Sequence, residues 1–204
     1  GLTVANSVTT YCDSVMLSNA SYEYSNAIIH KQGLGFRGFG EVKVYDYVTD
    51  KYTSQTFDPQ RFSVPIKDES YEHSNVYTYN IAITANKIAQ IRLTNKVSTD
   101  KLKNVSLTGS YIYDTYGNVL KEIINYGNGL ETVQSNTFQN INENSIYILG
   151  LPLTQEVTKK RNGEAAIVGL TKCVYNTNYL PIKKEQYITS SDKVKEEVFE
   201  YDDK

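Results

Sequence analysis

Hydrophobic and polar residues alternate along most of this chain with a period of two. The alternation is clearest at residues 41–48, 105–113 and 119–126. Successive side chains of a β-strand point to opposite faces, so this period predicts half-exposed strands. The spacing at 83–93 also fits a helix, but its neighbours favour strands there too. Because no segment shows a sustained helical period with end caps, the sequence predicts an all-β chain.

One short phrase closes several of the predicted strands: an aromatic or apolar residue, any residue, Tyr, and then Asp, Asn or Ser. It occurs at 22–25, 77–80, 111–114, 173–176 and 199–202, and a shortened form occurs at 44–46. Asp and Asn favour turns because their side chains bond the backbone two residues on, so each phrase is interpreted as a strand running into a β-turn. Its recurrence predicts antiparallel hairpins repeated into a strip or spiral sheet, in which each hairpin buries its apolar face only against its neighbours.

The clearest hairpin spans residues 105–126, with its turn at 114–118. Gly117 stands where the chain must reverse, and a residue without Cβ adopts positive φ at little cost. We therefore expect a positive φ at Gly117.

Two polar stretches interrupt the alternation. Residues 58–75 contain two prolines and predict a possible sub-boundary, while the Asn-rich residues 134–146 predict a second loop. Residues 1–204 are otherwise expected to form one fragment of a larger β-repeat array. The chain starts with Gly rather than Met and stops at 199–204, the opening of another repeat, so we expect a piece of a longer protein.

The composition narrows the choice of partner. The chain has 18 Tyr against 6 Phe and no Trp, and such amphipathic rings suit large, half-exposed sheets. A net charge of -2 provides no basic field for phosphates, so no nucleic-acid partner is predicted. No apolar run of about 18 residues exists, so no membrane span is predicted in this fragment.

Motifs that could carry cofactor or metal chemistry are weak. Gly33, Gly35 and Gly38 fit the dinucleotide pattern G-x-G-x-x-G, but that pattern binds a pyrophosphate only where a helix follows, and a strand is predicted here. His30 and His73 are the only histidines, and neither has a second ligand at metal-binding spacing. No cofactor and no metal site are predicted.

Catalytic residues are not predicted either. Cys12 and Cys173 are too few for a zinc site or a disulfide-rich scaffold, and Cys173 fills the apolar position of its phrase, as a small buried hydrophobe would. The paired carboxylates at 196–197 and 202–203 are adjacent on predicted strands and point to opposite faces. The sequence therefore predicts that this fragment is not an enzyme, and it assigns no binding residues.

Three segments together carry a family resemblance. The sequence Tyr-Asp-Thr-Tyr-Gly-Asn-Val-Leu at 113–120, with Gly127 following, resembles the YD repeat of RHS-repeat proteins. Residues 35–44 resemble the glycine- and arginine-rich "RGFLGF" strand in the shell region of virulence-associated and insecticidal-toxin relatives, and residues 149–154 resemble their "LLGLPT" segment. The chain departs from the pattern at 175–179, which lacks the repeat's Gly, and it lacks the segments with which such shells cleave themselves.

The resemblance implies a β-sheet wound into a large shell or spiral strip. Bacteria use such shells in secreted or cell-surface proteins that enclose or display a separate effector domain. The partners it implies are adjacent repeats of the parent chain and an effector domain, with no chemistry in this fragment.

A carbohydrate-binding surface is the alternative function, with a glycan as partner. Exposed Tyr rings can stack on the C–H faces of sugars, and Asn and Asp side chains can bond the hydroxyls. Tyrosines gathered on one exposed concave surface would favour this alternative, and tyrosines buried between turns of the strip would favour the scaffold.

Overall fold

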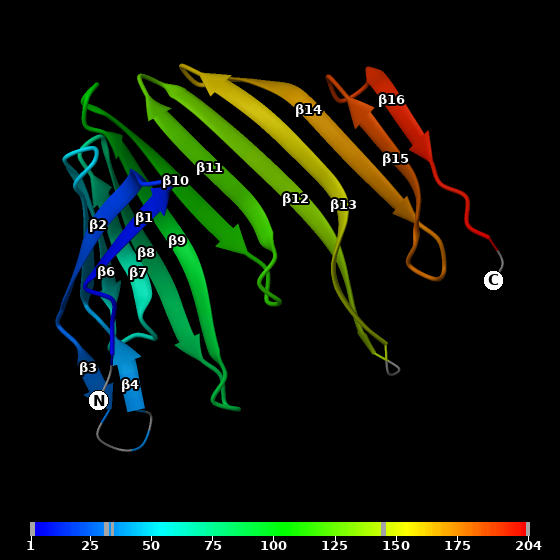
Figure 1. The fold of residues 1–204 in the computed structure, drawn as a ribbon. Helices are drawn as coiled ribbons and strands as arrows, with labels where there is room; N and C mark the ends of the chain where they lie inside the picture. The colour runs from blue at the N-terminus through cyan, green and yellow to red at the C-terminus, as the bar shows by residue number, and fades with distance from the viewer. Residues whose placement is uncertain (1–2, 31–32, 34, 144–145, 203–204) are drawn as a thin grey trace. The chain divides into compact units, whose positions relative to one another are not determined.

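The computed structural model describes all residues except 1–2, 31–32, 34, 144–145 and 203–204, and Leu34 of the glycine motif therefore lies outside the described residues. The described residues form sixteen β-strands and no helix, so the predicted all-β, antiparallel fold class is confirmed. The chain divides into two compact units, Gly1–Ser106 and Leu107–Lys204. Figure 1 shows the strands in chain order.

The first unit is an antiparallel sheet with the strand order β1-β2-β5-β6-β7-β8-β9, beside a separate two-stranded sheet of β3 and β4 (Figure 1). Its strands are β1 (Ser7–Cys12), β2 (Val15–Ser25), β3 (Ile28–His30), β4 (Gly35–Gly38), β5 (Glu41–Asp46), β6 (Lys51–Asp58), β7 (Val64–Ser70), β8 (His73–Ile83) and β9 (Ala89–Asp100).

The second unit is an antiparallel meander in which strands adjacent in sequence are hydrogen-bonded neighbours. Its strands are β10 (Val105–Tyr113), β11 (Val119–Gly127), β12 (Leu130–Glu143), β13 (Ile146–Arg161), β14 (Glu164–Tyr175), β15 (Pro181–Tyr187) and β16 (Lys193–Val198).

Both predicted loops are largely strands. Residues 58–75 contain all of β7 and the start of β8. Pro65 is tolerated in β7 because it pairs with Phe57 next to a register shift, where a missing N–H disrupts the ladder least. Residues 134–143 belong to β12, and Ile146 begins β13. The two strands pair through polar residues such as Thr137 and Thr154, whose hydroxyls lie 2.7 Å apart. Polar residues are compatible with strands here because both faces of the sheet meet solvent.

Two of the recurring phrases are not followed by the expected turn. Asn80 pairs with Arg92 inside β8, which continues to Ile83. The phrase at 199–202 follows β16, which ends at Val198, instead of closing it. An Asx residue favours a turn only where the ladder does not continue, and at Asn80 the partner strand β9 keeps the chain extended.

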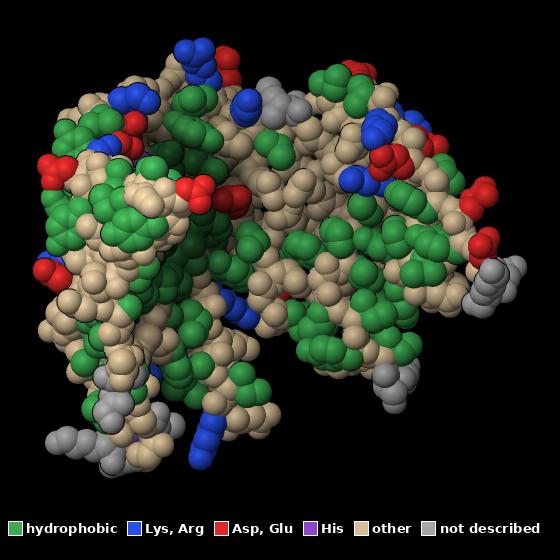
Figure 2. Space-filling view, viewed as in Figure 1, with side chains coloured by type: hydrophobic (Ala, Val, Ile, Leu, Met, Phe, Trp, Pro, Cys, Tyr) green, Lys and Arg blue, Asp and Glu red, His purple; other side chains and the backbone are tan. Residues whose placement is uncertain are grey.

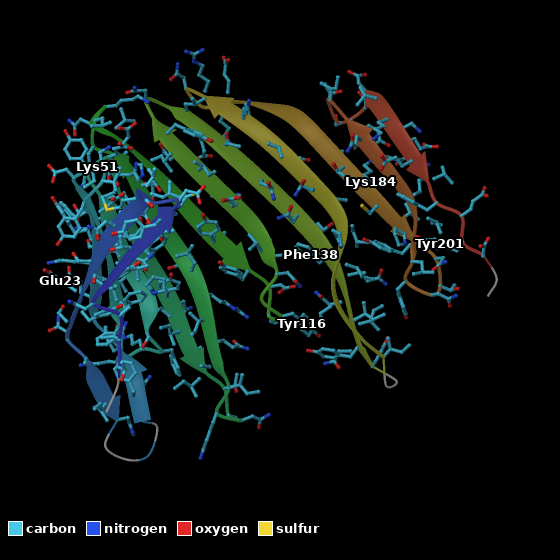
Figure 3. All side chains as sticks on the ribbon, in the orientation of Figure 1. Glu23, Lys51, Tyr116, Phe138, Lys184 and Tyr201 are labelled. Carbon is cyan, nitrogen blue, oxygen red and sulfur yellow. The ribbon has the colours of Figure 1, made fainter. Side chains whose placement is uncertain are left out.

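The sheets have almost no buried core. Within the described residues, the buried hydrophobic side chains are Val64, Val133 and Pro59. Side chains project from both sides of the strands (Figure 3), and hydrophobic ones lie among polar ones on the visible surface (Figure 2). The accessible surface is 14164 Å², against about 9,700 Å² for a compact monomer of this mass. The chain therefore buries far less surface than a globular domain of its size.

Candidate functional site

The turn after β10 has the geometry that the YD phrase predicts. The Asp114 N–H donates to the Asn118 carbonyl oxygen at 3.0 Å, and the Gly117 N–H donates to the Asp114 carbonyl oxygen at 3.3 Å. Oδ1 of Asp114 accepts the backbone N–H groups of Tyr116 at 2.9 Å and Asn118 at 2.8 Å. Gly117 has φ 99°, so the predicted positive φ is confirmed. Asp114 thus holds the whole turn through its backbone and its carboxylate.

The turn after β14 is the same structure without the glycine. The Asn176 N–H donates to the Leu180 carbonyl oxygen at 2.9 Å, and the Tyr179 N–H donates to the Asn176 carbonyl oxygen at 3.0 Å. Oδ1 of Asn176 accepts the N–H groups of Asn178 and Leu180 at 2.9 and 3.0 Å. Tyr179 takes the place of Gly117 with φ 61°. The turn is therefore intact without the glycine, and Tyr179 adopts a left-handed conformation in its place.

A third turn of this kind follows β8. The Thr84 N–H donates to the Ile88 carbonyl oxygen and the Lys87 N–H to the Thr84 carbonyl oxygen, each at 2.9 Å. The Thr84 hydroxyl accepts the Ile88 N–H at 3.1 Å, and Lys87 has φ 61°. This turn begins with Thr instead of the Asp or Asn of the recurring phrase, so the phrase did not reveal its likeness to the YD turn.

A polar network joins the Asp114 turn to the β12–β13 hairpin. Oδ2 of Asp114 accepts the side-chain amides of Asn118 and Asn140 at 2.8 and 3.0 Å, and Oδ1 of Asn140 accepts the Gly150 N–H at 2.8 Å. Burial raises the pKa of Asp114, but hydrogen bonds led by the Asn118 amide lower it more, so the pKa lies below its ordinary value. Gly150 has φ 75°, a conformation in which a residue with a Cβ is strained, and an added Cβ would also lie 2.7 Å from Oδ1 of Asn118. Two of the three family-like segments thus contact each other.

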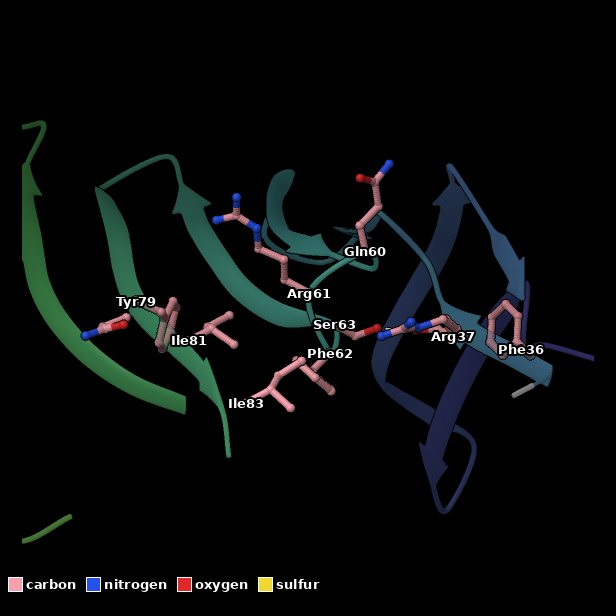
Figure 4. Close-up of a pocket in the computed structure, with 10 residues that line it drawn as sticks. Phe36, Arg37, Gln60, Arg61, Phe62, Ser63, Tyr79, Ile81 and Ile83 are labelled. Atoms are coloured by element: carbon pink, nitrogen blue, oxygen red, sulfur yellow. Dashed lines mark hydrogen bonds between the residues drawn. The ribbon is translucent and has the colours of Figure 1, made fainter. Parts of the chain in front are cut away.

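A groove of about 980 Å³ opens on the first unit between β4, the loop after β6 and the end of β8 (Figure 4). We call it the arginine groove. It is lined by Phe36, Arg37, Gln60, Arg61, Phe62, Ser63, Tyr79, Asn80, Ile81 and Ile83.

The loop that forms one wall of the arginine groove is held by Asp58. Oδ1 of Asp58 accepts the N–H groups of Gln60 and Arg61 at 3.1 and 3.2 Å, and its carbonyl oxygen accepts the Ser63 N–H at 2.9 Å. Phe62 and Ser63 both have left-handed φ values, 65° and 54°. Consecutive non-glycine residues rarely adopt this conformation, and the surrounding contacts must maintain it.

The charged residues that line the arginine groove are all positive. Its lining residues include two cations and no acidic side chain. The Arg37 guanidinium lies 5.7 Å from the centroid of the Phe62 ring, and the Ser63 hydroxyl donates to the Arg37 carbonyl oxygen. Nε of Arg61 lies 3.8 Å from Oδ2 of Asp58, and the Arg61 side chain is 70% exposed. The groove is therefore suited to an anionic partner.

A second groove, of about 570 Å³, lies on the first unit among β2, β5, β6 and β7. We call it the tyrosine groove, because Tyr45, Tyr47 and Tyr52 line it. Tyr45 and Tyr52 are cross-strand partners, and the rings of Tyr45 and Tyr47 meet edge to face with centroids 4.8 Å apart. Tyr47 is 56% exposed and Tyr52 47%. Three tyrosines of the β5–β6 hairpin thus gather on one surface.

Carboxylates complete the lining of the tyrosine groove. Glu23, Glu41 and Glu69 all line it, and Glu23 is labelled in Figure 3. Hydrogen bonds from the Lys101 and Lys67 ammonium groups lower the pKa of Glu69 to about 2. Glu69 is therefore ionised throughout the physiological range and acts as a hydrogen-bond acceptor.

The residues considered for cofactor or metal chemistry do not converge. Gly35 and Gly38 lie in the short strand β4. His30 ends β3 and His73 begins β8, and the described residues contain no group of three or more His, Cys, Asp or Glu placed to hold a metal ion. Cys12 and Cys173 are both free thiols. Sequence reasoning missed both grooves, because their residues come together only through long-range pairing.

No family model matches the chain, and no curated protein matches it in sequence. Crystal structures of TcdB2-TccC3 without its hypervariable C-terminal region, of TcdB2-TccC3-TEV and of TcdB2-TccC3 match it in fold, with TM-scores of 0.68, 0.70 and 0.65. Each match covers 83% of this chain at 10% identity. The chain has the fold of an RHS-repeat shell.

The RHS-type fold agrees with the three Asx- and Thr-initiated turns, which sit between consecutive strands. The chain spans only 15% of the length of each TcdB2-TccC3 chain that it matches. An identity of 10% shows shared architecture alone. The described residues include no helix with the length and apolar character needed to cross a membrane.

Proposed function

We propose that this chain is a non-catalytic structural module of a bacterial RHS/YD-repeat protein, secreted or on the cell surface, that encloses or displays an effector domain. The observation that carries the proposal is a sheet of RHS-shell fold with almost no core of its own. A sheet with two exposed faces is suited to a wall, because one face can meet solvent and the other an enclosed chain. Adjacent repeats of the parent chain and the effector domain are the partners.

The test is cryo-electron microscopy of the full-length protein that contains this chain. We expect the strands described above to form part of the wall of a hollow body, with density for a separate domain inside it or attached to it. A solid domain in which other elements of the same chain pack on both faces of the sheet would contradict the proposal.

A carbohydrate-binding surface is the second candidate, because Tyr47 and Tyr52 are exposed in a groove that also presents carboxylate acceptors. The test is a glycan array probed with the chain and with the variant Tyr47→Ala/Tyr52→Ala. Tyr116→Ala is the matched control, since Tyr116 is also 47% exposed but lies in the Asp114 turn. Binding that is lost only in the double variant supports this function, and absence of binding, or equal loss in the control, contradicts it.

A further inference from the structure

The arginine groove borders the edge of a strand and not one face of it. Tyr79, Asn80 and Ile81 are consecutive in β8, and all three line the groove. Consecutive residues of a strand point to opposite faces, so a groove that contacts three of them in a row must run along the strand's edge.

The ladder between β7 and β8 ends before this edge begins. In the described residues the two strands pair from Glu69 with Ser74 to Lys67 with Val76, and their registered pairs go no further toward Ile83. The loop of Arg61 and Phe62 lies across the groove from Ile81 and Ile83 (Figure 4). The space beside Asn80 to Ile83 can therefore accept an extended chain, as in β-strand addition.

The charged residues that line the arginine groove indicate the charge of its partner. The whole chain has four arginines and a net charge of -2. Two of these four, Arg37 and Arg61, line the groove. Guanidinium groups bind carboxylates through paired, charge-assisted hydrogen bonds. A concentration of arginines in an acidic chain favours a carboxylate-rich partner.

Apolar side chains in the groove add a second requirement. Phe36 is 41% exposed, Phe62 44% and Ile83 66%. Exposed rings and aliphatic groups beside a strand edge offer contacts for the alternate side chains of an added strand. A partner that is only acidic would leave this surface uncovered.

We propose that the arginine groove binds an extended peptide segment in which acidic residues adjoin aromatic or aliphatic ones. The peptide main chain lies along the edge of β8 at Asn80–Ile83. Its carboxylates meet Arg37 and Arg61, and its apolar side chains cover Phe62 and Ile83. This site is separate from the tyrosine groove and does not depend on the sheet being a shell wall.

Fluorescence anisotropy with a labelled Glu-Glu-Val-Phe-Glu-Tyr-Asp peptide tests the site, because that sequence, found at 196–202 of this chain, has the required chemistry. Arg37→Gln and Arg61→Gln should each weaken binding about tenfold, as expected for loss of one charge-assisted contact. Arg161→Gln, in β13, is the matched control and should leave binding unchanged. Circular dichroism of each variant separates loss of binding from loss of fold.

The peptide itself supplies two further comparisons. Replacing its acids with Gln and Asn should abolish most of the binding. N-methylation of one alternate set of backbone nitrogens should weaken binding strongly and that of the other set little, because a strand pairs through every second residue on one edge. Equal binding by the wild type and the Arg37→Gln/Arg61→Gln variant, or equal effects of the two methylated sets, would overturn the proposal.

Discussion

Single residues decide where this sheet turns. Asp114, Asn176 and Thr84 occupy the same position in three turns and accept backbone N–H groups through their side-chain oxygens. The fourth residue of each turn has positive φ, whether it is Gly117, Tyr179 or Lys87. The hydrogen bond to the first side chain thus occurs whether the fourth residue is glycine or not.

Because Tyr179 has a positive φ, we expect glycine to give a more stable protein than alanine at this position. Tyr179→Gly should be more stable than Tyr179→Ala by about 1 kcal/mol, because both lose the ring but only Gly adopts φ 61° without a Cβ clash. Gly117→Ala should lose a similar amount, since nothing lies within 4 Å of the added Cβ and the backbone conformation alone is responsible. Urea titrations of the three variants measure this, and an Ala variant at 179 as stable as the Gly variant would show that the turn carries no strain.

Glu69 predicts a pH dependence of the first unit. Its pKa is lowered to about 2 by the Lys101 and Lys67 ammonium groups, so the stabilisation is complete above the unfolded value of about 4.3 and is lost as the pH falls toward 2. Unfolding of Glu69→Gln should therefore depend less on pH between about 4.5 and 2 than that of the wild type. Glu200→Gln is the control, and matching pH profiles for both variants would contradict the prediction.

At the scale of elements, the YD turn also fixes the neighbouring β12–β13 hairpin. Asn140 links the Asp114 carboxylate to the Gly150 N–H, although Asp114 and Gly150 are far apart in sequence. Asp114→Ala should therefore cost about 1–3 kcal/mol and should speed amide hydrogen exchange at Gly150. Exchange at Leu180, in the Asn176 turn, should not change. An unaltered rate at Gly150 would mean that the network does not hold the hairpin.

The sequence predicted the local elements better than their extent. The turn at 114–118 was predictable because Asp114 and Gly117 act on their own backbone. The extent of β7 and β12 was not, because Pro65 and the Asn-rich residues are accommodated by partner strands that no local pattern reveals. The arginine groove was not predictable for the same reason: Arg37 and Ile83 come to line one groove only after β3–β4 and β8 have folded.

At the scale of the whole molecule, exposed apolar surface predicts association. The chain exposes 14164 Å², including large hydrophobic residues such as Ile29, Tyr147 and Val198 at 69, 71 and 65%. The isolated 204-residue chain should bind a hydrophobic dye in its folded state and self-associate as its concentration rises. Sedimentation velocity from about 1 to 100 μM measures this. A monomer without dye binding across that range would show that the exposed surface is not adhesive.

The lack of a core has a consequence for how such a sequence can evolve. In a globular domain, each inward side chain must fit several others, so substitutions are coupled across the interior. Here the buried hydrophobic residues among those described are Val64, Val133 and Pro59, and the backbone ladders and the turns define the architecture. The side chains on one face of each strand can then be substituted independently of those on the other face.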